Sequence, residues 1–99
     1  MSYEMTVGLD VQDVARYAEY RAGMMPILEA YGGGFRYDFE VARTLRKEEG
    51  GEINRVFVLR FPDRETKEKF FADAAYLAVR EEYFVSSVGN VSLIAEYER

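Results

Sequence analysis

Residues 53–80 have the sequence INRVFVLRFPDRETKEKFFADAAYLAVR, which is typical of a strand followed by a helix. From Ile53 to Phe61 the run is rich in the β-branched and aromatic side chains that favour strands. Pro62 ends the strand because proline donates no ladder hydrogen bond, and Asp63 can cap the helix that follows. The strand is apolar on both of its faces, so each face needs cover from another layer or from a partner.

Outside this stretch, alternating and helical spacings predict three further strands and one further helix. Their predicted ranges are 3–9, 12–31, 35–46 and 90–97. The helix over 63–84 is expected in two pieces that join near Asp73. Pro26 predicts a kink or a restart in the first helix, because its missing amide breaks the bond to Ala22. Residues 47–52 are expected to form a hairpin loop.

The resulting order, β-α-β-β-α-β, predicts a single α+β domain over residues 1–99. This is the ferredoxin-like arrangement, in which a four-stranded antiparallel sheet carries two helices on one face. The first and third strands should lie in the centre, and the second and fourth at the edges.

The other face of this sheet would be bare in a monomer, over roughly 350 Å². It should include Val56, Val58 and Ile94, with Thr6 and Gly8 between them. Apolar patches of this kind often mark interfaces, so we expect a homodimer, that is, a dimeric α/β barrel. The alternative is a monomer with a half-polar open sheet.

The composition excludes several classes of function. The 99-residue chain has a net charge of −5 and no basic stripe, which argues against binding to nucleic acid or to an anionic membrane surface. It has no cysteine, which excludes disulfides and fits a reducing compartment, so we expect a cytoplasmic protein. No signal peptide or membrane-spanning run is evident.

Metal or cofactor binding is not expected either. Zinc is improbable without His or Cys. Glu48, Glu49 and Glu52 lack the ordered spacing of a calcium loop, so a solvated loop is the expected reading.

Three charged residues at alternate positions on the second predicted strand form the main candidate site for ligand binding or catalysis. Arg36, Asp38 and Glu40 would share one face. If that face lines a barrel interior, Arg36 could bind a carboxylate and Asp38 could act as a base, the only catalytic candidate in the chain. The alternative is the solvated face of an edge strand.

Two further groups are candidates for ligand binding. Tyr17, Tyr20 and Met24 share one side of the first helix and would roof an apolar pocket, unless they are simply core. Asn54 and Arg55 open the central strand and would point either toward a cleft beside Arg36 or into solvent.

The chain resembles a known bacterial family. The carrying residues are Tyr17 and Tyr20 in RYAEYR, Pro26-Ile27-Leu28, Tyr31-Gly32-Gly33, FPDRE at 61–65, Tyr76-Leu77 and Arg80. Over nearly its whole length it resembles the domain-of-unknown-function family numbered thirteen-thirty, in the dimeric α/β-barrel superfamily. The resemblance implies a ferredoxin-like subunit whose sheet packs against a second copy. It implies no catalytic residue.

Related families in that superfamily include cofactor-free monooxygenases, muconolactone isomerase-like enzymes and haem-degrading enzymes. The haem branch usually relies on a His, which this chain lacks. From the bare sheet face and the candidate binding residues we expect a homodimer that binds a small apolar or anionic molecule. The alternative is a cofactor-independent monooxygenase or isomerase acting on a small aromatic or lactone-like substrate.

Overall fold

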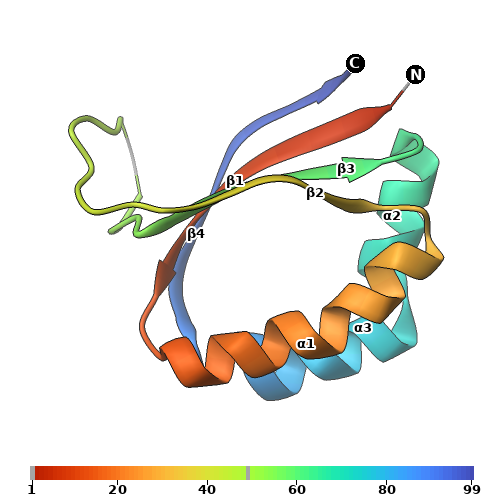
Figure 1. Ribbon diagram of the computed structural model, residues 1–99, viewed down its shortest axis with the longest axis horizontal. Coiled ribbons are helices and arrows are strands. Elements are labelled where there is room, and N and C mark those ends of the chain that lie inside the picture. Colours follow the sequence, from red (N-terminus) through yellow and green to blue (C-terminus); the bar gives the residue numbers. More distant parts are fainter. Residues whose placement is uncertain (1, 49) are drawn as a thin grey trace.

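The computed structural model describes residues 2–48 and 50–99 and contains one antiparallel sheet with helices on one face (Figure 1). The strands are β1 (Tyr3–Val11), β2 (Gly34–Glu40), β3 (Arg55–Phe61) and β4 (Val88–Glu98). The helices are α1 (Val14–Ala30), α2 (Arg64–Ala72), α3 (Ala74–Val79) and the π-helix η1 (Arg80–Phe84). The sheet order β2-β3-β1-β4 confirms the predicted ferredoxin-like fold, with the first and third strands in the centre.

Aspartate side chains begin the helices where the sequence predicts them. The Asp63 carboxylate accepts from the Thr66 amide at 2.7 Å, and Asp73 accepts from the Ala75 and Tyr76 amides at 2.8 and 3.0 Å. Asp73 therefore ends α2 and caps α3, which confirms the predicted junction.

The first helix differs from the prediction at Pro26. The helix is assigned without a break from Val14 to Ala30, so the expected restart is wrong. Met24 and Leu28 lie on either side of the proline and are 2% and 0% exposed. Their burial in a common core holds both halves of the helix against the sheet.

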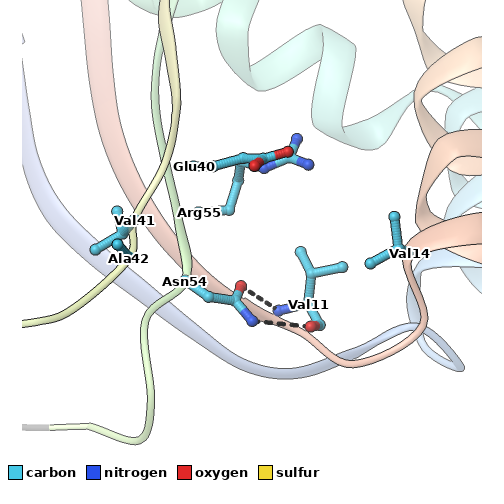
Figure 2. Close-up of a pocket in the computed structure, with 7 residues that line it drawn as sticks. All are labelled: Val11, Val14, Glu40, Val41, Ala42, Asn54 and Arg55. Atoms are coloured by element: carbon cyan, nitrogen blue, oxygen red, sulfur yellow. Dashed lines mark hydrogen bonds between the residues drawn. The ribbon is translucent and has the colours of Figure 1, made fainter.

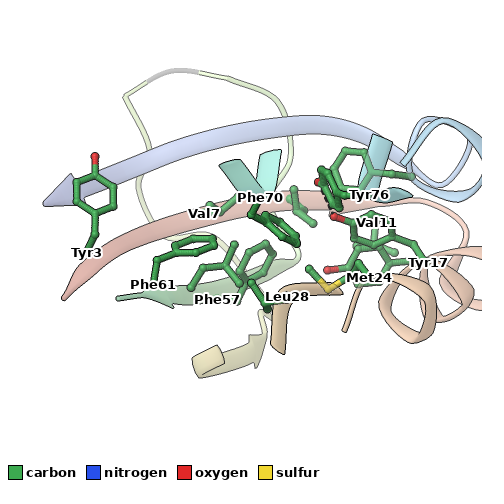
Figure 3. Close-up of a cluster of buried hydrophobic side chains, with 14 residues drawn as sticks. Tyr3, Val7, Val11, Tyr17, Met24, Leu28, Phe57, Phe61, Phe70 and Tyr76 are labelled. Atoms are coloured by element: carbon green, nitrogen blue, oxygen red, sulfur yellow. Dashed lines mark hydrogen bonds between the residues drawn. The ribbon is translucent and has the colours of Figure 1, made fainter. Parts of the chain in front are cut away.

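The core lies between the sheet and the helices (Figure 3). Phe70 is fully buried, and its ring centroid lies 5.7 Å from that of Phe61 and 4.4 Å from that of Tyr76. This aromatic contact joins α2, β3 and α3. Within the ranges 2–48 and 50–99, no helix is long and apolar enough to cross a membrane.

A β-bulge in β2 overturns the predicted face of this strand. Phe35 pairs with Leu59 and Tyr37 pairs with Val58, so Arg36 is an extra residue between them. Paired residues share a face of the sheet. After the bulge Asp38 turns toward the helices, whereas Arg36 pairs with Glu4 on the opposite face. The prediction that Arg36, Asp38 and Glu40 share one face is therefore wrong.

The face of the sheet away from the helices, called here the open face, gains apolar side chains from this bulge. Tyr37 and Phe39 are each 53% exposed there, and their stacked rings lie 5.9 Å apart. Val56 and Val58 lie beside them and are half-buried. A second shift in β4, between its pairings with Thr6 and Val7, brings Ala95 and Tyr97 to the open face while Val91 and Leu93 face the helices.

The connection between β2 and β3 is longer than predicted. β2 ends at Glu40 rather than at residue 46, and β3 begins at Arg55. Residues 42–48 project beyond the end of the sheet (Figure 1). Ile53 folds back onto the open face, where its methyl groups lie 3.1–3.2 Å from the position that a Cβ on Gly8 would take. The glycine in β1 therefore makes room for this isoleucine.

Candidate functional site

An apolar cavity of about 220 Å³ lies between the sheet and the helices. Sheet residues of three strands form its floor: Met5, Val7, Leu9, Phe57, Leu59, Val91 and Leu93, with Phe35 from β2. Tyr17, Tyr20 and Met24 of α1 form part of its roof, as the sequence predicts for a pocket. Val91 and Leu93 are each 52% exposed, so the cavity has an apolar margin along the edge strand β4.

Two tyrosine hydroxyls meet at this cavity. Tyr20 and Tyr76 are 6% and 3% exposed, and their hydroxyl oxygens lie 2.9 Å apart. Burial raises the pKa of both phenols, and at Tyr76 the hydrogen bond with Tyr20 and the charge of Arg80 oppose this rise. Both hydroxyls are therefore protonated at neutral pH and act as neutral hydrogen-bonding groups.

An ion pair closes the end of the cavity near β2. Arg21 donates to the Asp38 carboxylate at 2.6 Å and to the Tyr17 hydroxyl at 3.0 Å, and its guanidinium lies 3.8 Å from the centre of the Phe35 ring. Arg21 lies on the apolar side of α1, and Asp38 neutralises its charge there. The Asp38 carboxylate thus accepts from Arg21, and its predicted role as a base stays a prediction.

Arg55 lies next to this pair. Its guanidinium is 3.9 Å from the Asp38 carboxylate and 5.1 Å from the centre of the Tyr17 ring. Arg55, Asp38 and Tyr17 also line an open hollow against α1, beside the cavity. Two guanidiniums therefore share one carboxylate at this end.

Asn54 has a structural contact pattern. Its side chain accepts from the Val11 amide at 2.8 Å and donates to the Val11 carbonyl at 2.9 Å (Figure 2). It fastens the end of β1 to the start of β3, at a separate shallow hollow that also contains Glu40 and Arg55. Arg36 lies on the open face, with its Nε 3.2 Å from the Glu4 carboxylate. The structure therefore does not bring Arg36, Asp38, Asn54 and Tyr20 into one cavity.

Sequence reasoning missed the contribution of the C-terminal end of the helical layer. Arg80 and Phe84, the first and last residues of η1, both line the cavity. The Val85 amide donates to the Arg80 carbonyl at 3.2 Å, which is the i→i+5 bond of a π-turn. Such turns are rare in proteins, and many of those known lie at functional sites. The spacing of apolar residues in the sequence does not predict a π-turn.

The side chains that the structure describes contain no cluster of three or more His, Cys, Asp or Glu placed to hold a metal ion.

A family model for a domain of unknown function, DUF1330, matches residues 3–97. The chain belongs to the DUF1330 family. The DUF1330 assignment confirms the resemblance seen in the sequence, and it carries no activity. A comparison with curated proteins found no match.

Solved structures support the DUF1330 fold at low sequence identity. RPA0582 from Rhodopseudomonas palustris, a protein of unknown function, has a TM-score of 0.83 at 16% identity, over 99% of this chain and 82% of that one. SnoaB from Streptomyces nogalater, a cofactor-independent oxygenase, has a TM-score of 0.60 at 13% identity, over 99% and 95% of the two chains. A dimeric protein of unknown function with a ferredoxin-like fold, from Bacteroides fragilis, has a TM-score of 0.56 at 12% identity, over 99% and 96%. At these identities the likeness shows the fold alone.

Proposed function

We propose that the protein is a homodimer that pairs the open faces of two sheets, and that each subunit binds a small molecule in the cavity beneath its own helices. The observation that carries the dimer is the apolar surface of the open face. Tyr37, Phe39 and Ile94 are each 53% exposed on the sheet, and Tyr97 is 41% exposed. A patch of large apolar side chains on a sheet without a second covering layer is typical of an interface.

The hydrophobic contribution is large enough to matter. Covering the apolar half of a face of roughly 350 Å² on each of two subunits gives about 9 kcal/mol gross. The loss of translational and rotational freedom opposes much of this. Edge strands and the residues around Glu4 must therefore add to the contact. The relative from Bacteroides fragilis is described as dimeric, which agrees with this proposal.

The buried carboxylate of Glu4 fits an interface rather than a solvated face. Glu4 is 1% exposed, and it accepts from the Tyr97 hydroxyl at 2.9 Å. Arg36 and Arg99 approach the same carboxylate at 3.2 and 3.4 Å. Its charge is thus fully paired before a second copy arrives, so docking leaves no buried charge without a partner.

The test of the dimer is the mass of the protein in solution. We expect the wild-type chain to sediment as a dimer at micromolar concentration and Val58→Asp to sediment as a folded monomer, because the substitution places a charge in the centre of the open face. A wild-type protein that is already monomeric at that concentration would remove the dimer from the proposal.

The test of the cavity uses toluene, a neutral aromatic probe. In NMR spectra of the protein saturated with toluene, the amide resonances of Tyr20, Met24 and Tyr76, which surround the cavity, should shift. Those of residues 42–48 should stay unchanged. Absence of any shift at the cavity contradicts the small-molecule site.

Catalysis without a cofactor is the second candidate, as a monooxygenase or an isomerase. Two neutral phenol hydroxyls inside an apolar cavity would suit an oxygen-bearing aromatic substrate, and SnoaB, a cofactor-independent oxygenase, shares the fold. The assay is oxygen uptake with hydroquinone as probe, comparing wild type with Tyr76→Phe and with Asp38→Asn. Uptake no faster than in buffer alone counts against the oxygenase, and an unchanged rate in Asp38→Asn removes Asp38 from its mechanism.

A further inference from the structure

The charged side chains around the cavity and the adjoining hollow beside β4 are paired, with one exception. The pairs are Arg21 with Asp38 at 2.6 Å, Lys67 with Glu96 at 2.5 Å, and Arg64 with Glu68 at 3.4 Å. Arg80 also lines the cavity, and among residues 2–48 and 50–99 no carboxylate lies within 4.0 Å of its guanidinium. The guanidinium carbon lies 5.1 Å from the centre of the Phe84 ring.

Hydrogen-bond donors exceed acceptors at the same place. In the Tyr20–Tyr76 pair one hydroxyl donates to the other, so the second hydroxyl keeps a proton to donate. Arg80 follows Tyr76 by four residues, and its amide donates to the Tyr76 carbonyl, so the two side chains lie on the same face of the helical segment. A guanidinium has five donors and no acceptor. This corner of the cavity therefore offers several donors to a group that only accepts.

The rest of the cavity is apolar and largely aromatic. Phe71, Phe84, Met24 and Leu93 line it together with the two tyrosine rings. A volume of about 220 Å³ equals that of roughly seven water molecules in the liquid. It suits a single ring with one short polar substituent, and aromatic walls favour a ring through edge-to-face contacts.

We infer that the cavity binds a small monocyclic aromatic carboxylate, with its ring among Met24, Phe71 and Leu93 and its carboxylate on Arg80 and the Tyr20–Tyr76 hydroxyls. The inference rests on the proposed small-molecule site and adds the class and the orientation of the ligand. The π-turn of η1 fits this role, because it places both Arg80 and Phe84 on the wall of the cavity.

The opposite end of the cavity offers a rival orientation. Arg21 lines the cavity there and shares the carboxylate of Asp38 with Arg55, which lines the adjoining hollow. Their carboxylate is already present, whereas Arg80 has none within ion-pair distance in the described ranges. The Arg80 end is therefore the favoured anion site, and Arg55 provides the comparison that distinguishes the two ends.

The experiment compares phenylacetate with phenylacetamide, its neutral isostere, by titration calorimetry and amide shifts. The variants are Arg80→Gln, Tyr76→Phe, Arg55→Gln and, as a surface control, Arg64→Gln. In the wild type we expect the acid to bind at least tenfold more tightly than the amide, as a charged hydrogen bond provides. Arg80→Gln should abolish this preference and leave the affinity for the amide unchanged. Tyr76→Phe should lower the affinity for phenylacetate by about tenfold, and Arg64→Gln should change the affinity for neither compound.

Three results would overturn the inference. Equal affinities for acid and amide in the wild type mean that no anion site exists, although toluene binding would still support the cavity. Loss of the preference in Arg55→Gln but not in Arg80→Gln places the carboxylate at the other end. If toluene, acid and amide all fail to bind, the proposed small-molecule site fails as well. Arg80 is exposed, so its variant folds and the comparison can be made without loss of the protein.

Discussion

Phe39 provides the sharpest quantitative test of the proposed dimer. The side chain is 53% exposed on β2 and stacks on Tyr37. A phenylalanine presents about 200 Å² of surface, so roughly 100 Å² of Phe39 remains for a partner to cover. At about 25 cal/mol per Å² this corresponds to about 2.5 kcal/mol in each subunit. A two-fold interface uses the same patch twice, which gives about 5 kcal/mol per dimer.

Phe39→Ala should therefore weaken dimerisation by about three orders of magnitude, after allowance for the surface that alanine keeps. The assay is sedimentation equilibrium over a range of protein concentrations, with the fold checked by circular dichroism. Leu77→Ala is the matched control, because Leu77 is 46% exposed but belongs to α3 in the helical layer. An unchanged dissociation constant for Phe39→Ala, or an equal loss for Leu77→Ala, would refute the assignment of the open face as the interface.

Three predictions concern folding stability. A Cβ at Gly33 would lie 2.6 Å from Leu28 and 3.0 Å from a backbone carbonyl, so Gly33→Ala should lower the free energy of unfolding by about 1–3 kcal/mol; Gly34→Ala, where nothing lies within 4 Å, should change it by less than about 0.5 kcal/mol in the same urea titration. Phe70→Ala removes a fully buried ring and should cost about 3–5 kcal/mol by urea unfolding. The Tyr31 hydroxyl, at 2.7 Å, and two backbone amides lower the pKa of Asp73. Its stabilisation is complete above the unfolded pKa of about 3.9 and is lost as pH falls through the lower folded value, so the stability difference between wild type and Asp73→Asn should shrink below about pH 4; a difference that grows on acidification would contradict this.

The element order, the central strands and the junction at Asp73 could be predicted because each depends on local chemistry. Alternation marks the strands, and an aspartate that can accept from free amides marks each helix start. Tyr17, Tyr20 and Met24 line the cavity because a helical stripe that faces a sheet lies over the space left between them. Their role in ligand binding stays a prediction. The position of Arg80 at the cavity was not predicted, because it depends on a π-turn.

The faces of β2 could not be predicted from alternation, because alternation holds only in a strand without a bulge. Phe35, Tyr37 and Phe39 suggest one continuous apolar face. In the structure the extra residue at Arg36 sends Phe35 to the cavity and the other two to the open face. Ion pairs on both sides fit this arrangement, since Arg36 meets Glu4 on one face and Asp38 meets Arg21 on the other.

Both edge strands, β2 and β4, contain a bulge that changes the face of the sheet on which their side chains lie. In β4 the shift near Ile94 leaves Leu93 facing the helices and brings Ala95 and Tyr97 to the open face. Each edge strand therefore supplies apolar side chains to the cavity with one part of its length and to the open face with the other. A monomer would gain nothing from turning aromatic side chains of both edge strands toward water, since burying them beside the helices stabilises the fold more. The bulges in both edge strands therefore agree with the proposed dimer, in which a second copy of the chain covers the open face.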